Sequence, residues 1–316
     1  MCIRDSYNEE ISLKSGVVLQ GAGAQVTTLH GSGTGPHVVR AIAADANTRI
    51  DRFTITGGIR AVGGHEGSGI YCEDSSLTIS NNIIHSCEAE YGGGIRLLRS
   101  PATIQNNTIS GNYAIAGGGI FAEQSPEVVI SCNVIQDNEV PNWGGGIFAD
   151  DTAQIENNVI SGNNVTEGVN GGGGINAYGS GVTIINNTIV NNSVPASRGG
   201  GISSDPSKPP SIINCIFWGN SGGDLYLCSA TYSDIEDGNA GEGNISEDPG
   251  FLRADSNNYR LRPGSPCIDS ATSGGPSTDI DGRNRPKGNG YDMGAYEFYP
   301  ISNAPVIMLL LSEGTP

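Results

Sequence analysis

The chain has 316 residues, of which 48 are glycine, 36% are hydrophobic and 6% are aromatic. This composition is too apolar and too regular for a disordered chain, and too rich in glycine for a helical fold. The formal net charge is −17 and no cluster of Lys and Arg interrupts it, so nucleic acid and anionic membrane surfaces are unfavourable partners.

The two ends of the chain differ from its middle. Residues 1–6, MCIRDS, look unrelated to the rest of the chain, and we interpret them as a non-native start. The most apolar stretch, Pro305 to Leu311, is far shorter than the roughly 20 residues that cross a bilayer. We therefore expect no membrane span in this fragment, and we expect that a signal peptide and an anchor are missing from it.

A repeat fills the region between the ends. Strand-like segments at 17–21, 27–31, 38–42 and 49–58 come first, and a Gly-x-Gly-Ile signature then recurs at intervals of 25 to 28 residues. The isoleucines of this signature are Ile70, Ile95, Ile120, Ile147, Ile175 and Ile202. A repeat of this length is typical of a solenoid in which each coil contacts only its neighbours.

Each repeat places three apolar residues at strand spacing. Apolar and polar residues alternate around the signature, at the period of a strand. The second column consists of Ile79, Ile104, Ile130, Ile155, Ile184 and Ile212, and the third of Ile84, Ile109, Ile135, Ile160, Ile189 and Phe217. One coil alone has no way to bury these residues, whereas stacked coils make continuous columns about 4.8 Å apart.

Asparagine pairs mark one corner of each repeat. They are Asn81-Asn82, Asn106-Asn107, Asn157-Asn158 and Asn186-Asn187, with Cys132-Asn133 and Asn214-Cys215 in the remaining copies. Asn tolerates a left-handed backbone, and its amide can bond to the equivalent amide of the next coil. We interpret the pairs as a structural ladder.

These patterns predict an all-β fold, a right-handed parallel β-helix of about nine coils. We expect the β-helix over residues 7–245, a small capping domain over 246–299, and a linker or truncated tail over 300–316. The stacked coils resemble the pectin-lyase-like superfamily, and the GGGI and Phe-Trp-Gly-Asn (217–220) motifs also resemble the repeats of the chlamydial polymorphic membrane proteins.

The C-terminal region resembles the choice-of-anchor Q domain of bacterial surface proteins. The motifs that carry this resemblance are DPGF (248–251), GSPCID (264–269), DIDG (279–282) and DMGAYEF (292–298). The resemblance implies export and attachment to a bacterial cell surface, and it implies no reaction.

One face of the β-helix is the candidate binding site. If the signature isoleucines point inward, the residues that follow them point outward and should be exposed. The resulting set is Tyr71, Phe121, Phe148 and Tyr178 with Glu73, Glu123, Asp150 and Asp205, while Tyr91, Trp143 and Arg198 precede the glycines and overhang the same edge. Aromatic rings beside carboxylates suit a neutral or basic polysaccharide. The leading hypothesis is an adhesin-like secreted or surface protein that binds polysaccharide or another surface without catalysis; the other reading of this face is a solvated strand edge with ordinary aromatic residues.

The alternative is a polysaccharide lyase or glycoside hydrolase. Glu123 and Asp150 lie one coil apart, a spacing compatible with the roughly 5 to 9.5 Å between glycosidase carboxylates. Alternatively, Glu123, Asp150 and Asp151 could hold Ca²⁺ with Arg96 as the base, as the resemblance to pectate lyases implies. Cations are too few along the repeat to suit an acidic polymer.

The remaining candidates lie near the C-terminus. Asp279, Asp281 and Asp292, beside Arg283 and Arg285, are either a calcium site or an ion-paired cap over the open end of the β-helix, and we favour the cap. Seven cysteines at irregular spacing predict neither a metal cluster nor a disulfide framework, and Cys228 with Cys267 is the one pair worth testing for a bond. We expect a monomer with no cofactor, Ca²⁺ being the one ion that these acidic residues suggest.

Overall fold

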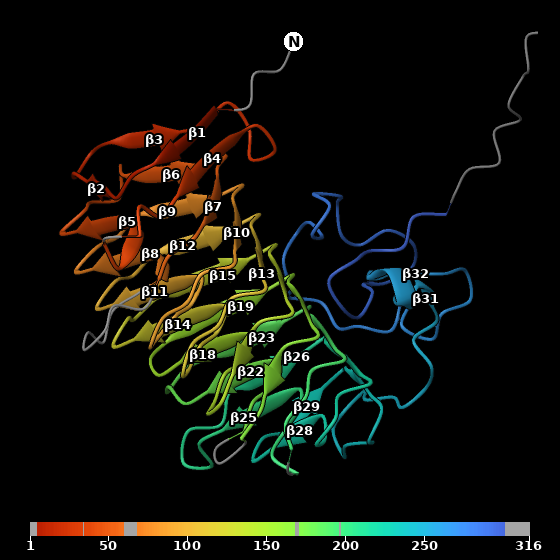
Figure 1. Cartoon of the computed structure of the whole chain (residues 1–316). Helices are drawn as coiled ribbons and strands as arrows, with labels where there is room; N and C mark the ends of the chain where they lie inside the picture. Colours follow the sequence, from red (N-terminus) through yellow and green to blue (C-terminus); the bar gives the residue numbers. More distant parts are fainter. Residues whose placement is uncertain (1–4, 34, 60–67, 168–170, 196, 301–316) are drawn as a thin grey trace, which may run out of the picture.

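The computed structural model describes residues 5–33, 35–59, 68–167, 171–195 and 197–300, and it shows a rod of stacked coils with a smaller C-terminal segment beside it (Figure 1). Apart from one short 3-10 helix, η1 (Ala254–Ser256), the regular elements of these residues are β-strands. The predicted all-β class is therefore confirmed.

Three parallel sheets run the length of the rod, and each coil contributes one strand to each sheet. Sheet A has ten strands: β1 (Asp5–Asn8), β4 (Thr27–His30), β7 (Thr54–Thr56), β10 (Ile83–His85), β13 (Thr108–Ser110), β16 (Val134–Gln136), β20 (Val159–Ser161), β24 (Thr188–Val190), β27 (Ile216–Trp218) and β30 (Asp234–Ile235). Sheet B has nine: β2 (Ile11–Leu13), β5 (His37–Ile42), β8 (Ser68–Glu73), β11 (Ile95–Leu98), β14 (Ile120–Glu123), β18 (Ile147–Ala149), β22 (Ile175–Ala177), β25 (Ile202–Ser204) and β28 (Leu225–Tyr226). Sheet C also has nine: β3 (Val18–Gln20), β6 (Arg49–Asp51), β9 (Thr78–Ser80), β12 (Thr103–Gln105), β15 (Val128–Ser131), β19 (Ala153–Glu156), β23 (Thr183–Ile185), β26 (Ser211–Ile213) and β29 (Ala230–Thr231).

The three predicted columns form the core of the rod. In sheet B the strands pair in register from Ile70 through Ile95, Ile120, Ile147 and Ile175 to Ile202. The columns that begin at Ile79 and Ile84 pair in the same way in sheets C and A. All of these side chains are buried in one continuous cluster. Stacking identical isoleucines buries apolar area and pairs the backbone between coils at the same time.

The asparagine corners are structural, as predicted. The first residue of each pair has a left-handed backbone, with φ of 57° at Asn106 and 54° at Asn157. The second residue is buried and forms a ladder, in which the Asn107 Nδ2 donates to Asn133 Oδ1 over 3.0 Å and the Asn82 backbone N–H donates to Asn107 Oδ1 over 2.9 Å. A second ladder runs through Asn112, Asn138, Asn163, Asn192 and Asn220.

The chain between a sheet A strand and the following sheet B strand forms a further strip outside sheet B. This strip was not predicted from the sequence. From Glu88 to Ser221, successive coils make extra bridges between their sheet A and sheet B strands, among them Tyr91 to Ala116 and Ala116 to Trp143, and β17 (Glu139–Val140) pairs with β21 (Asn164–Val165). A second buried cluster forms here from Ala89, Ala114, Val140, Val165 and Val194.

Glycine allows this strip to turn back over the outer face of sheet B. Gly117 has a φ of 61°, and a Cβ at this position would lie 2.6 Å from the Cβ of Phe121. Gly144 repeats the arrangement against Phe148, at 3.0 Å. The first glycine of each triplet therefore permits both a left-handed backbone and a close approach.

The C-terminal segment, residues 246–300, packs against the side of the rod rather than over its end (Figure 1). Its Tyr259, Ala295 and Tyr296 form a buried cluster with Val159 of β20 and Val190 of β24. It contains the two-stranded antiparallel sheet of β31 (Phe251–Arg253) and β32 (Asn258–Leu261). The segment therefore covers apolar outer positions of sheet A, and the expected position over the open end is wrong.

Several smaller predictions concern the ends and the cysteines. Asp5 and Ser6, assigned to the non-native start, lie in β1, while residues 1–4 and 301–316 fall outside the described part of the chain.

Cys228 and Cys267 do not form a disulfide. The Cys267 thiol is buried and donates instead to Asp234 Oδ2 over 3.1 Å.

Candidate functional site

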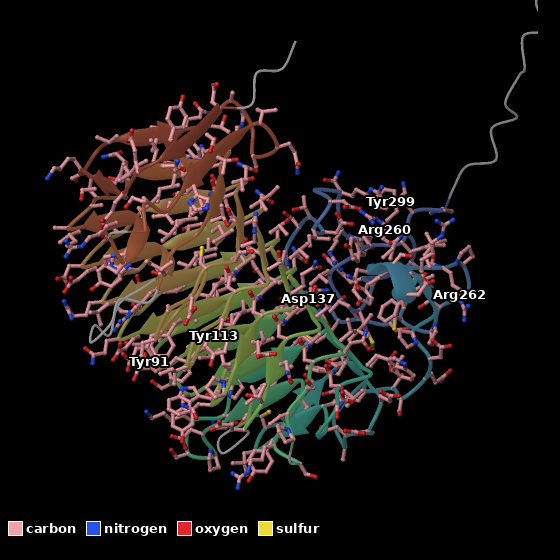
Figure 2. All side chains as sticks on the ribbon, in the orientation of Figure 1. Tyr91, Tyr113, Asp137, Arg260, Arg262 and Tyr299 are labelled. Carbon is pink, nitrogen blue, oxygen red and sulfur yellow. The ribbon has the colours of Figure 1, made fainter. Side chains whose placement is uncertain are left out.

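The outward side chains of sheet B form one ladder, as their spacing predicted. Tyr71, Arg96, Phe121, Phe148 and Asn176 follow one another in register across successive coils. Figure 2 shows Tyr91, which overhangs this ladder, well separated from Arg260 and Tyr299 of the C-terminal segment. The ladder and the C-terminal segment are therefore distinct regions of the surface.

The expected exposure of this ladder is wrong for its first members. Tyr71 is 2% exposed, Arg96 8% and Phe121 5%. The Tyr71 ring stacks on His37, and the Arg96 guanidinium lies 5.2 Å from the centre of the Tyr91 ring. Phe121 is enclosed between Tyr91 and Phe148, whose ring centres are 5.0 Å and 4.5 Å away. The overhanging strip turns these outward residues into a second buried layer.

The aromatic ladder ends at Asn176, and a pocket opens there. Trp143, Phe148, Asn176 and Tyr178 line a pocket of about 230 Å³. The Trp143 and Phe148 rings are 6.4 Å apart and tilted by 50°, and Tyr178 is 47% exposed. Three of the four lining residues were predicted. Asn176 was missed as a site residue, although it is the position at which the column changes from the aromatic Phe148 to the short polar side chains of Asn176 and Ser203.

Two buried polar atoms at this pocket are unsatisfied. Asn176 is 1% exposed, and its Oδ1 has no hydrogen-bond partner within the described part of the chain. Its Nδ2 is 3.4 Å from the carbonyl oxygen of Gly171. The Trp143 Nε1–H likewise has no acceptor among the described residues. A buried donor or acceptor without a partner costs about 1 to 3 kcal/mol, so the pocket favours a ligand or water that supplies one.

Most carboxylates beside the ladder already form ion pairs or hydrogen bonds within the protein. The Arg96 guanidinium lies 3.3 Å from Glu123 Oε2, and the Arg99 guanidinium lies 2.7 Å from Glu73 Oε1. Asp150 Oδ1 accepts from the Gln124 backbone N–H over 2.7 Å, and burial raises the pKa of Asp150. Because Arg96 is buried among aromatic rings and paired with Glu123, it is poorly placed to abstract a proton from a bound polymer.

Comparison with known proteins agrees with the observed coils. The family model of a right-handed β-helix region matches residues 15–169 and 142–259. The chain belongs to this right-handed β-helix family. The predicted handedness is thereby confirmed.

One solved β-helix resembles this right-handed β-helix over most of its length. It is a crystal structure of pectate lyase Pel9A, with a TM-score of 0.56 and 16% sequence identity over 93% of this chain and 84% of that one. At this identity the likeness shows the fold alone, a parallel β-helix as predicted. No curated protein sequence matches this β-helix.

Two predicted members of the face lie apart from the pocket of this β-helix. Asp205 accepts hydrogen bonds from the Ser207 backbone N–H and hydroxyl, which lower the pKa of its carboxyl group. The Arg198 guanidinium lies 6.0 Å from the centre of the Tyr226 ring. Neither side chain lines the pocket.

The acidic residues of the C-terminal segment have separate partners and do not converge. Asp281 pairs with Arg260 over 2.6 Å, Asp279 accepts from the backbone N–H groups of Arg283 and Glu297, and Asp292 accepts from those of Asp269 and Phe298. Among the described residues, no three His, Cys, Asp or Glu side chains come together in a way that could hold a metal ion. The structure therefore does not assemble either calcium site considered from the sequence.

The structure also bears on the membrane prediction. Within the described ranges, no helix is long and apolar enough to cross a membrane.

Proposed function

We propose that this protein is a secreted or cell-surface β-helix that binds polysaccharide without cleaving it. The observation that carries the proposal is the pocket of Trp143, Phe148, Tyr178 and Asn176, where three aromatic side chains surround a buried amide. Aromatic rings stack on the apolar faces of sugars, and the amide and indole N–H can exchange hydrogen bonds with sugar hydroxyls.

The size of the pocket suits an anchoring subsite. Its volume of about 230 Å³ is smaller than the roughly 300 to 1,000 Å³ of drug-sized sites, so it holds one sugar ring. The rest of an extended chain would lie along the rod axis, next to Glu123 and Asp150. A net charge of −17 disfavours an acidic polymer there, and a neutral or basic glycan is the proposed ligand.

The engaged carboxylates support binding without catalysis. Glu123 is held by Arg96, and Asp150 is held by the Gln124 backbone N–H. A general acid and a base that flank a bound sugar need to face the scissile bond. The similarity to the pectate lyase is no evidence for lyase activity in this chain, because 16% identity supports the fold alone.

Binding can be followed by the fluorescence of Trp143. The chain has two tryptophans, Trp143 at the pocket and Trp218 beneath the C-terminal segment, so Trp218→Phe leaves Trp143 as the single reporter. We expect neutral oligosaccharides of glucose, xylose or mannose, or basic chitosan oligosaccharides, to change this fluorescence. Oligogalacturonates should not.

The matched variants are Tyr178→Ala and Phe148→Ala on this background, which should weaken binding at least tenfold. Tyr113→Ala, another exposed tyrosine that does not line the pocket, should bind as the parent does. If none of these glycans binds, the proposal is wrong. If mass spectrometry finds shortened or unsaturated products, the alternative of a hydrolase or lyase replaces it.

A further inference from the structure

A second pocket lies between the rod and the C-terminal segment. Cys132, Gln154, Glu156 and Asn157 line it from the rod, and the loop of residues 274–278 closes it from the other side. Its volume of about 460 Å³ is within the range of small-molecule sites. The lining is largely polar and belongs to sheet C and the adjacent corner, so this crevice is separate from the aromatic pocket on sheet B.

Asn157 contributes to this crevice an amide whose nitrogen is bonded and whose oxygen is not, within the described chain. It is 2% exposed, and its Nδ2 donates to the Thr278 carbonyl oxygen over 2.7 Å. Its Oδ1 has no hydrogen-bond partner among the residues that the structure describes. This buried amide oxygen is therefore available to accept a hydrogen bond from a ligand or a water molecule in the crevice.

The equivalent asparagines of the next two coils provide an internal comparison. Asn186 donates to the carbonyl oxygen of Asp292 and accepts from Asn214 Nδ2. Asn214 donates to the Thr272 carbonyl oxygen and accepts from the Thr272 backbone N–H. Both therefore use both ends of their amides, Asn214 against the C-terminal segment and Asn186 against the segment and Asn214. Of these three asparagines, Asn157 is the one whose amide oxygen has no partner among the described residues, and it is the one that lines the crevice.

The crevice also contains a carboxylate without a cationic partner. Glu156 Oε2 accepts from Gln154 Nε2 over 2.8 Å, and no Lys or Arg of the described ranges forms an ion pair with it. Burial is the main cause that raises the pKa of Cys132, and the charges of Glu156 and Asp279 raise it further. The free acceptors at this point, Glu156 and Asn157 Oδ1, thus favour a ligand that carries positive charge and N–H groups.

We propose that this crevice binds a small molecule through a protonated primary amine, which donates a hydrogen bond to Asn157 Oδ1 and pairs with the Glu156 carboxylate. An amino sugar or a short aliphatic diamine has this chemistry. The proposal does not depend on the polysaccharide site.

Cys132 provides a local measurement, because its half-buried thiol lines the crevice. Its alkylation rate in the whole chain is followed by mass spectrometry of the peptide that contains it, with the half-buried Cys228 as the internal reference. Two matched pairs of probes are used, putrescine with butanediol and glucosamine with glucose. We expect the two amines to slow the alkylation of Cys132 at least threefold and to leave Cys228 unchanged, whereas the two neutral partners have no effect.

The variants test the ion pair. Glu156→Gln should raise the amine concentration needed for protection at least tenfold, whereas Glu127→Gln, which removes the same charge from an exposed position outside the crevice, should not change it. Equal protection by the neutral partners, equal behaviour of the two variants, or an alkylation rate that no probe changes would each overturn the proposal. In the last case water alone satisfies Asn157.

Discussion

Phe121 and Phe148 stack with their ring centres 4.5 Å apart and their planes 10° from parallel, yet only Phe148 remains half exposed. The two residues occupy the same position in successive coils. A glycine turn lies against both residues, so the difference arises from their neighbours: Phe121 lies between the rings of Tyr91 and Phe148, whereas the position beyond Phe148 is occupied by the short side chain of Asn176. The outer face of sheet B is therefore buried around Phe121 and partly open to solvent from Phe148 onward.

This division predicts different effects for two equivalent substitutions. Phe121→Ala should lower the free energy of unfolding by about 3 kcal/mol, because it leaves a cavity in a buried layer. Phe148→Ala should cost only about 1 kcal/mol, the value of one lost stacking partner, and should act mainly on glycan binding. Denaturant unfolding of both variants checks this. Equal losses of stability would show that the face is not divided in this way.

The asparagine ladder predicts a second difference within one pair. Asn107→Leu removes the acceptor of the Asn82 N–H and the donor to the Ile79 carbonyl oxygen, so it should destabilise the rod by about 2 kcal/mol or more. Asn106→Gly is the control, because Asn106 is exposed and its φ of 57° suits glycine. Melting curves should separate the two variants clearly, and an unchanged melting temperature in Asn107→Leu would contradict the structural role.

Docking of the C-terminal segment on sheet A can be tested with two glycines of similar backbone. A Cβ at Gly294, with φ 86°, would lie 2.7 Å from Ile216 Cδ1 and 2.8 Å from Thr188 Oγ1, whereas one at Gly264, with φ 84°, meets no atom within 4 Å. Both Ala variants carry the backbone strain, but only Gly294→Ala should loosen the interface. Limited proteolysis of residues 246–300 measures this. Equal cleavage of the two variants would argue against the docked arrangement.

The same interface predicts a dependence on pH. Burial raises the pKa of Asp234 to about 6, although the Cys267 thiol and the Glu247 N–H, which donate to the carboxylate, lower it. The folded chain therefore binds this proton more tightly than the unfolded chain does, and the stability gained is complete below about pH 4 and is lost as the pH rises through about 6.

The measurement is the unfolding free energy of the parent and of Asp234→Asn between pH 4 and pH 8. The parent should lose about 2 kcal/mol more than the variant over this range. Groups remote from this carboxyl contribute to both chains alike, so the difference reports Asp234 together with Glu247 and Asp224, whose charges act on it. Parallel curves would contradict the assignment.

The sequence by itself determined the coil. The isoleucine columns, the asparagine corners and the strand segments follow from local chemistry, because a period of two within each strand and a period of 25 to 28 residues between coils leave one way to bury the isoleucines. Three of the four residues of the aromatic pocket were also predicted, since they occupy outward or overhanging positions of the same repeat.

Tertiary structure alone decided which outward residues meet solvent. Alternation along a strand tells which side chains leave the central core, but not whether another segment covers them. Tyr91 packs on Phe121, His37 stacks on Tyr71, and the C-terminal segment buries Val159 and Val190 on sheet A. In each case the covering residues come from a different coil or from a distant part of the chain. Their positions therefore depend on how the whole rod stacks, and no local pattern records them.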